Sequence, residues 1–263
     1  LREYWVTIHG VRLRAHVFND TLDDAVPFLF LNGIGTNIEL AHGFAAQFPS
    51  RRFIALEMPG CGKTPATDTP LAPALLARII VQAAEQLDAP RFDLIGFSLG
   101  GMLAQQVALQ YRTQLRSLVL AGTCSGFTML FHDWSEETLT RAWPPFAAIW
   151  QDLERDLVGV HLREAQITTP QAMLAQMAGF TGWSSLAFLP FISVPTLVLA
   201  GSQDRIIAPS NAPQLSAFTP GAQHHVISEA GHLSPFTAPA RAAARVHDFM
   251  RDRVLSPNET EAA

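Results

Sequence analysis

The sequence predicts an α/β fold, in which a mostly parallel central sheet is covered by helices on both faces. Two observations indicate this class. Short, unbroken apolar runs, typical of strands buried on both faces, recur along the chain. Amphipathic helical patterns alternate with these runs, as expected when parallel strands are joined by crossover helices. The 263 residues, of which 48% are hydrophobic, allow one large domain or two small ones.

The first element is a predicted hairpin. Residues 5–8 and 12–18 alternate apolar with polar side chains around His9-Gly10, which indicates an antiparallel pair with one face toward solvent. The buried strands and their helices follow in order. We expect strands at 28–31, 52–56, 92–95, 118–120, 196–199 and, more weakly, 223–227, with helices at 72–87, 100–111, 211–218 and 239–254.

One segment breaks this alternation. Residues 124–190 contain no convincing buried strand, hold four of the five tryptophans, and show helical periodicity at 150–162 and 170–178. An aromatic helical insert between two strands predicts a cap. The chain is therefore expected to have a core domain formed by residues 1–123 and 191–263, with a helical cap at 124–190 inserted before the last two strands.

Charge and cysteine content exclude several classes of function. The net charge is −5, and Lys63 is the only lysine among 18 basic residues, so we expect no nucleic-acid partner. No apolar run reaches the roughly 18 residues of a membrane span. Cys61 and Cys124 exclude a disulfide framework; free thiols would indicate a cytoplasmic location, although one bridge stays open. Residues 1–5 do not resemble a signal peptide, and whether a segment precedes Leu1 also stays open.

Gly-Phe-Ser-Leu-Gly at 96–100 has the Gly-x-Ser-x-Gly pattern between a predicted strand and a predicted helix. In that context the pattern indicates a nucleophile elbow. The turn is so tight that side chains at Gly96 and Gly100 would collide with the strand and helix. It would hold the Ser98 hydroxyl at the carboxyl edge of the sheet, beside a helix N-terminus that favours negative charge.

A serine hydroxyl needs a base, and the base needs an acid that orients it. Six histidines follow Ser98, and His232 is the one in a loop after the last strand, where it would return to the carboxyl edge. Asp204 is the only acid in the loop after strand 196–199. It precedes His232 by 28 residues, enough for one helix and one strand.

Two backbone N–H groups should stabilise the oxyanion of a tetrahedral intermediate. We expect one from Leu99, directly after the nucleophile, and one from Ile34 in the loop Asn32-Gly33-Ile34-Gly35-Thr36. A plain glycine turn is the competing interpretation of that loop. Asn32 and Gly33 are candidate substrate contacts. His224-His225 lacks metal-ligand spacing, so no metal or cofactor is expected.

These residues resemble those of the α/β-hydrolase superfamily. The similarity rests on the 96–100 elbow, Glu-Met-Pro-Gly-Cys-Gly at 57–62, Asp204 and Gly231-His232, and it covers the sheet domain. The resemblance implies an α/β-hydrolase fold and a serine hydrolase.

A narrower resemblance is to intracellular poly(3-hydroxyalkanoate) depolymerases of the medium-chain-length type. It is carried by Asn-Gly-Ile-Gly-Thr-Asn-Ile-Glu-Leu at 32–40, with Gly-Phe-Thr-Gly-Trp-Ser-Ser at 179–185, Pro-Thr-Leu-Val-Leu-Ala-Gly at 195–201 and Gly-His-Leu at 231–233. Residues 127–166 depart from the family pattern, so the acyl chain length is not predicted.

The resulting hypothesis is a serine ester hydrolase that cleaves an aliphatic polyester through Ser98, His232, Asp204 and an acyl-enzyme. Its partner would be the ester or a polymer granule surface. Aromatic residues near the ends of the cap, Phe127 and Trp183, are expected to line the cleft. A carboxylesterase for small soluble esters, a non-catalytic small-molecule receptor, and a perhydrolase or lyase on the same scaffold stay open.

Overall fold

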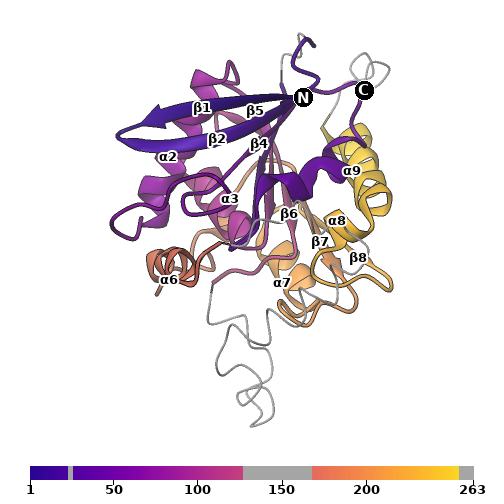
Figure 1. Ribbon diagram of the computed structural model, residues 1–263. Helices are drawn as coiled ribbons and strands as arrows, with labels where there is room; N and C mark the ends of the chain where they lie inside the picture. The colour runs from indigo at the N-terminus through magenta and orange to yellow at the C-terminus, as the bar shows by residue number, and fades with distance from the viewer. Residues whose placement is uncertain (23–25, 127–167, 255–263) are drawn as a thin grey trace.

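A computed structural model describes residues 1–22, 26–126 and 168–254 of the chain (Figure 1). One sheet with the strand order β1-β2-β4-β3-β5-β6-β7-β8 forms its centre, and helices lie on both sides of it. This confirms the predicted fold class. The strands are β1 (Arg2–Ile8), β2 (Val11–Phe18), β3 (Phe28–Leu31), β4 (Phe53–Leu56), β5 (Phe92–Phe97), β6 (Leu115–Ala121), β7 (Thr196–Gly201) and β8 (Gln223–Ile227).

The predicted hairpin at the N-terminus is confirmed. β1 pairs antiparallel with β2, and β2 pairs antiparallel with β4, whereas all other neighbours are parallel. His9 and Gly10 both have positive φ, 48° and 81°, as a two-residue hairpin turn requires. The antiparallel pair thus extends one edge of an otherwise parallel sheet.

The expectation that β2 turns its polar side chains to solvent is wrong for Arg14 and His16. Both are buried, with exposed fractions of 2% and 6%. The reason is that carboxylates from three separate segments reach the Arg14 guanidinium. Glu3 lies 2.7 Å from it and Glu57 lies 3.5 Å from it, and Glu39 also pairs with it. Alternation within β2 could not reveal partners contributed by distant segments.

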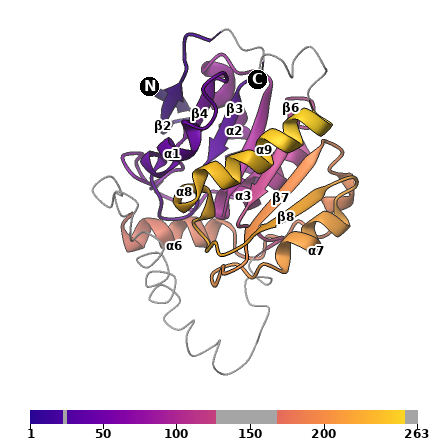
Figure 2. The same cartoon turned by 90° about the vertical axis from the view of Figure 1, so that its right-hand side faces the viewer.

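Two apolar clusters occupy the two faces of the sheet. In β3, Leu29 and Leu31 face one cluster, whereas Phe28 and Phe30 face the other, as the two-residue period of a strand requires. Helices α2, α3 and α7 cover the first face; α1, α8 and α9 cover the second, with α9 running across it in Figure 2. The helices are α1 (His42–Ala45), α2 (Pro73–Gln86), α3 (Leu99–Gln110), α6 (Pro170–Gly179), α7 (Asn211–Phe218), α8 (Ser234–Thr237) and α9 (Pro239–Arg253), with the 3-10 turns η1 (Ile38–Ala41) and η3 (Leu189–Phe191).

The described ends of the inserted segment lie together. Gly126 and Ser184 form an antiparallel bridge, and the Ser185 N–H donates to the Ser125 carbonyl at 2.8 Å. The predicted helix at 170–178 is confirmed as α6. Residues 127–167, which include the predicted helix at 150–162, lie outside the described residues. Within the described ranges, no helix combines the length and apolar character needed to cross a membrane.

Candidate active site

Ser98 occupies the turn between β5 and α3. Its backbone has φ 53° and ψ −120°, a conformation that costs a residue with a side chain about 1–3 kcal/mol. The turn is held on the β6 side, where the Ser98 N–H donates to the Ala121 carbonyl at 2.9 Å. Ser98 is therefore fixed at the carboxyl end of the central strands, at the N-terminus of α3.

The glycines on either side of Ser98 are required by packing. A Cβ on Gly96 would lie 2.5 Å from the Gly100 carbonyl oxygen. A Cβ on Gly100 would lie 2.4 Å from the carbonyl oxygen of Leu31 at the end of β3. Both distances are far below van der Waals contact with rigid backbone. Only glycine at these two positions lets α3 start this close to the sheet.

His232 lies in the loop after β8 and faces Ser98. Its Nε2 is 3.1 Å from Ser98 Oγ, and its Nδ1 is 2.8 Å from Asp204 Oδ2. Its ring also contacts Phe97, at 5.0 Å between ring centroids. Gly122 leaves room for the imidazole, because a Cβ there would be 3.3 Å from Nδ1. The three predicted side chains thus form one hydrogen-bonded chain.

Asp204 follows β7, and its carboxylate is completely buried. One oxygen faces His232. The other, Oδ1, accepts the N–H groups of Ile206 at 2.9 Å and Ile207 at 2.8 Å. These backbone donors fix the orientation of the carboxylate. His232 follows Asp204 by 28 positions, and α7 and β8 lie between the two residues, as the spacing predicts.

Two other histidines after Ser98 have hydrogen-bond partners away from the Ser98 turn. His224 Nδ1 pairs with a serine hydroxyl of α7 at 2.8 Å, and His247 Nε2 is 3.0 Å from a backbone carbonyl near α1. His132 and His161 lie outside the described residues. Among the histidines that the structure describes, the hydrogen bond to Ser98 belongs to His232.

The predicted oxyanion donors lie beside Ser98. A Cβ on Gly33 would come within 3.0 Å of Ser98 Cβ, so the Gly33–Ile34 peptide adjoins the nucleophile. Among the described residues, the Ile34 N–H has no hydrogen-bond acceptor. Leu99 is the first residue of α3, where N–H groups have no partner within the helix. Both predicted donor residues thus adjoin Ser98, and the role of their N–H groups as oxyanion donors stays a prediction.

Asn32, a predicted substrate contact, is 1% exposed and shapes this loop from within. Its Oδ1 accepts the Met58 N–H at 2.9 Å, and its Nδ2 donates to the carbonyls of Gly33 (3.1 Å) and Thr36. These bonds use both side-chain N–H groups. A direct contact between Asn32 and substrate stays a prediction, whereas its hydrogen bonds to the loop are observed.

The two predicted aromatic contacts have different outcomes. Trp183 is partly buried, and its indole N–H donates to Gln106 Oε1 at 2.7 Å. Its ring also packs edge-on against Phe180 and Phe188. Gln106 lies eight residues beyond Ser98 along α3, or about 12 Å at the helical rise, so the observed contacts of Trp183 are packing contacts. Phe127 lies outside the described residues.

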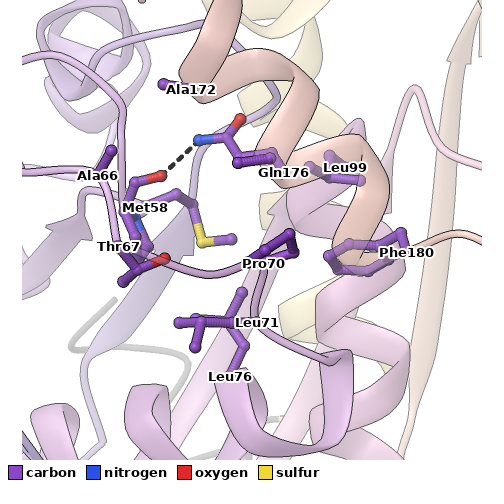
Figure 3. Close-up of a pocket in the computed structure, with 12 residues that line it drawn as sticks. Met58, Ala66, Thr67, Pro70, Leu71, Leu76, Leu99, Ala172, Gln176 and Phe180 are labelled. Atoms are coloured by element: carbon purple, nitrogen blue, oxygen red, sulfur yellow. Dashed lines mark hydrogen bonds between the residues drawn. The ribbon is translucent and has the colours of Figure 1, made fainter.

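The sequence did not predict a pocket beside α6 (Figure 3). It is a cavity of about 30 Å³, partly open to solvent, between α6, the 58–71 loop and the start of α2. Leu99, whose N–H is a candidate oxyanion donor, contributes its side chain to the lining. Most of the other lining side chains are apolar, among them Met58, Leu71, Ala175 and Phe180. A mostly apolar pocket therefore adjoins the nucleophile turn.

The loop that borders this pocket is held by a buried carboxylate. Glu57 Oε2 accepts the N–H groups of Lys63 and Thr64, each at 3.0 Å, and Oε1 accepts the Ile38 N–H at 3.3 Å. Burial raises the pKa of Glu57, and the nearby Arg14 counteracts this shift. Glu57 thus joins the 57–64 loop to the loop that carries Ile34. In the sequence, the motif Glu-Met-Pro-Gly-Cys-Gly at 57–62 marks this turn.

Within the described ranges, no group of three or more histidine, cysteine, aspartate or glutamate side chains could hold a metal ion. Cys61 and Cys124 are both free and buried. Burial raises the pKa of each thiol, that of Cys124 to about 11. Neither thiol is therefore activated as a nucleophile.

Comparison with known proteins identifies relatives over most of the chain. The model of the alpha/beta hydrolase family matches residues 28–246. A poly(3-hydroxyalkanoate) depolymerase from Ectopseudomonas oleovorans is 32% identical over 239 residues, which cover 86% of this chain and 84% of the relative. A pimeloyl-[acyl-carrier protein] methyl ester esterase from Neisseria meningitidis serogroup B is 27% identical over 252 residues, which cover 88% and 95%.

Solved structures with the same fold include two hydrolases. A thermophilic esterase from Thermogutta terrifontis has a TM-score of 0.79 at 21% identity and covers 97% of this chain and 100% of that one. An enol-lactonase from Burkholderia xenovorans LB400 has a TM-score of 0.77 at 18% identity and covers 95% and 100%. At these identities the likeness is one of fold.

Proposed function

This chain belongs to the alpha/beta hydrolase family and is an ester hydrolase of that superfamily, and on that premise we propose that it cleaves poly(3-hydroxyalkanoate) by serine catalysis. The observation that carries the chemistry is the hydrogen-bonded chain from Ser98 through His232 to Asp204. The choice of polymer is supported by the depolymerase that is 32% identical over most of both chains.

The proposed reaction starts with attack of Ser98 Oγ on the ester carbonyl. His232 Nε2, at 3.1 Å, takes the hydroxyl proton, and Asp204 stabilises the imidazolium through the 2.8 Å bond to Nδ1. The carbonyl oxygen becomes negative and receives the N–H groups of Ile34 and Leu99. Each such donor is typically worth a few kcal/mol of barrier.

Collapse of the tetrahedral intermediate releases the alcohol and leaves Ser98 acylated. His232 gives its proton to the departing alkoxide oxygen and then takes a proton from water, which attacks the acyl group. The second intermediate expels Ser98 Oγ and yields the free acid. Each ester bond thus consumes one water, and His232 returns to its starting state.

The aliphatic part of the substrate is assigned to the pocket beside α6. Its lining is mostly apolar, and it adjoins Leu99, one residue from the nucleophile (Figure 3). A 3-hydroxyalkanoate unit carries an alkyl side chain next to a polar ester, and burial of that chain contributes roughly 0.8 kcal/mol per methylene. The pocket therefore suits a polyester with alkyl side chains.

The cap and the cellular setting complete the proposal. We retain the division into a core of 1–123 and 191–263 with a cap at 124–190, in which Phe127 and Trp183 lie near the ends. The partner is the polyester, including the surface of a polymer granule. Free, buried Cys61 and Cys124 are compatible with action in the cytoplasm.

The test is a hydrolysis panel from short p-nitrophenyl esters through long ones to amorphous poly(3-hydroxyoctanoate). The proposal predicts release of soluble 3-hydroxyacids from the polymer. Turnover of short esters without any release from polymer would instead identify a small-ester carboxylesterase. Binding of esters with no turnover would identify a receptor and overturn the proposal.

A further inference from the structure

The carbonyl oxygen of Gly33 is surrounded by donors. Thr36 Oγ1 donates to it at 2.9 Å, Asn32 Nδ2 at 3.1 Å and the Thr36 N–H at 3.4 Å. The buried Cys61 thiol also points to it, at 3.9 Å. Such convergence on one carbonyl fixes the plane of the peptide that carries it.

That peptide also carries the Ile34 N–H. In a trans peptide the C=O and N–H point in opposite directions. Donors gathered on the Gly33 oxygen therefore direct the Ile34 N–H to the opposite side of the peptide. Gly33 itself adjoins Ser98, and the Ile34 N–H lacks an acceptor among the described residues. Hydrogen bonds to a carbonyl also polarise the N–H of the same peptide.

We propose that Thr36 is a positioning residue whose hydroxyl holds the Gly33–Ile34 peptide with its N–H aimed at the developing oxyanion. This inference rests on the proposed function and goes beyond it, because Thr36 does not touch the reacting atoms. Thr36 is 7% exposed, and within the described part of the chain its side-chain hydroxyl makes this one bond. Asn32 assists, but it also holds Met58 and the Thr36 carbonyl, so Thr36 is the cleaner site to change.

The experiment compares Thr36→Val with Thr36→Ser and with a matched control, Thr196→Val. Valine keeps the shape of threonine and removes the hydroxyl, whereas serine retains it. Thr196 is also buried and donates its hydroxyl to a backbone carbonyl, that of Val194 at 2.9 Å. It starts β7, at the end of the strand opposite to Asp204. Both valine variants lose one buried hydroxyl bond, but only one lies at the candidate oxyanion loop.

For Thr36→Val we expect kcat on a p-nitrophenyl ester to fall about tenfold, since loss of a whole oxyanion donor costs 10²–10³-fold. KM should stay within about twofold, because the N–H acts mainly in the transition state. An alkyl trifluoromethyl ketone adds Ser98 Oγ to its carbonyl and leaves an anionic oxygen at the same place. Its affinity should fall by the same factor as kcat/KM, and Thr36→Ser should restore both.

Three results would overturn the inference: equal kcat for Thr36→Val and Thr196→Val, a change confined to KM, or an unchanged affinity for the ketone. Thermal unfolding of each variant shows whether a lower kcat reflects loss of folded protein. Ser98→Ala distinguishes failure of the proposed function from failure of the positioning role of Thr36. If Ser98→Ala still turns over ester, the proposed function itself has failed; if it is inactive and the Thr36 results are negative, only the positioning role has failed.

Discussion

His232 Nδ1 lies 2.8 Å from Asp204 Oδ2, and both side chains are buried. A carboxylate accepts hydrogen bonds, so this contact places the imidazole proton on Nδ1. Nε2 is then left with a lone pair 3.1 Å from the Ser98 hydroxyl. The Asp204–His232 pair therefore sets the tautomer that a general base for Ser98 requires.

Changing Asp204 to asparagine should reverse this tautomer. An amide N–H in place of the carboxylate would donate to Nδ1 and move the proton to Nε2. We expect kcat for ester hydrolysis to fall by roughly 10⁴-fold, with the fold retained. Asp248→Asn, at a partly exposed carboxylate of α9, is the control and should keep full activity. An Asp204→Asn enzyme with more than a tenth of the wild-type kcat would remove Asp204 from the mechanism.

A larger side chain in the α6 pocket should shorten the preferred acyl chain. Ala175→Phe projects into the pocket, whereas Ala178→Phe is exposed on the same helix and serves as the control. For Ala175→Phe, kcat/KM on p-nitrophenyl decanoate should fall roughly tenfold, because the larger side chain takes space from the acyl chain and some of its apolar contact is lost. Activity on the acetate should change less than twofold. Equal losses on both esters would show that the pocket does not bind the acyl chain.

Gly62 should tolerate alanine much less than Gly182 does. Both have positive φ, 50° and 74°, so each alanine incurs about 1 kcal/mol of backbone strain. Of the two, only the Cβ at Gly62 would meet an atom among the described residues, Glu57 Oε1 at 2.1 Å. Displacing that buried carboxylate breaks several hydrogen bonds, for a total of roughly 3 kcal/mol. Urea unfolding of both variants measures the difference; equal losses would contradict the assigned role of Glu57.

The contact between Glu3 and Arg14 should make the free energy of unfolding depend on pH in the acidic range. A hydrogen bond from Arg14 lowers the pKa of Glu3 from 4.5 to about 2. A carboxyl group whose pKa is lower in the folded state stabilises the fold. This contribution is fully present above pH 4.5 and is lost as the pH falls toward 2. Glu3 is 41% exposed, so the contribution is below about 1 kcal/mol.

The measurement is the free energy of unfolding of wild type and Glu3→Gln between pH 2 and 7. Their difference should be largest near neutral pH and vanish near pH 2. Glu85→Gln, on the exposed face of α2, supplies the comparison for a carboxylate that has no such partner within the described ranges. A difference between wild type and Glu3→Gln that grows on acidification would contradict the assigned sign.

Local patterns predicted the elements well where neighbouring residues determine them. β3 has its predicted limits, because a short apolar run between turn residues leaves few alternatives. β8 also has its predicted limits, although its first three residues are polar. β5 reaches Phe97, beyond the predicted 95, because Gly96 and Phe97 still pair with β6 before the turn at Ser98. The short turns η1 and α8 were not predicted, since four residues carry too little periodicity.

Features assembled from distant segments escaped prediction. Burial of Arg14 depends on Glu3, Glu39 and Glu57, which no local pattern connects. The α6 pocket combines three separate segments for the same reason. The spatial relation of Ser98, Asp204 and His232 was predictable, because parallel strands end at one edge of the sheet and a known motif marks one of those ends.

The central claim is serine-dependent hydrolysis of polyester, and its most direct test is the release of 3-hydroxyacids from amorphous poly(3-hydroxyoctanoate) by wild type and Ser98→Ala. Ser216→Ala, at a partly buried serine on α7 whose hydroxyl pairs with His224, controls for loss of a serine. We predict release by wild type and Ser216→Ala, and a rate at least about 10⁴-fold lower for folded Ser98→Ala. Release by Ser98→Ala at a rate close to that of wild type would contradict the account.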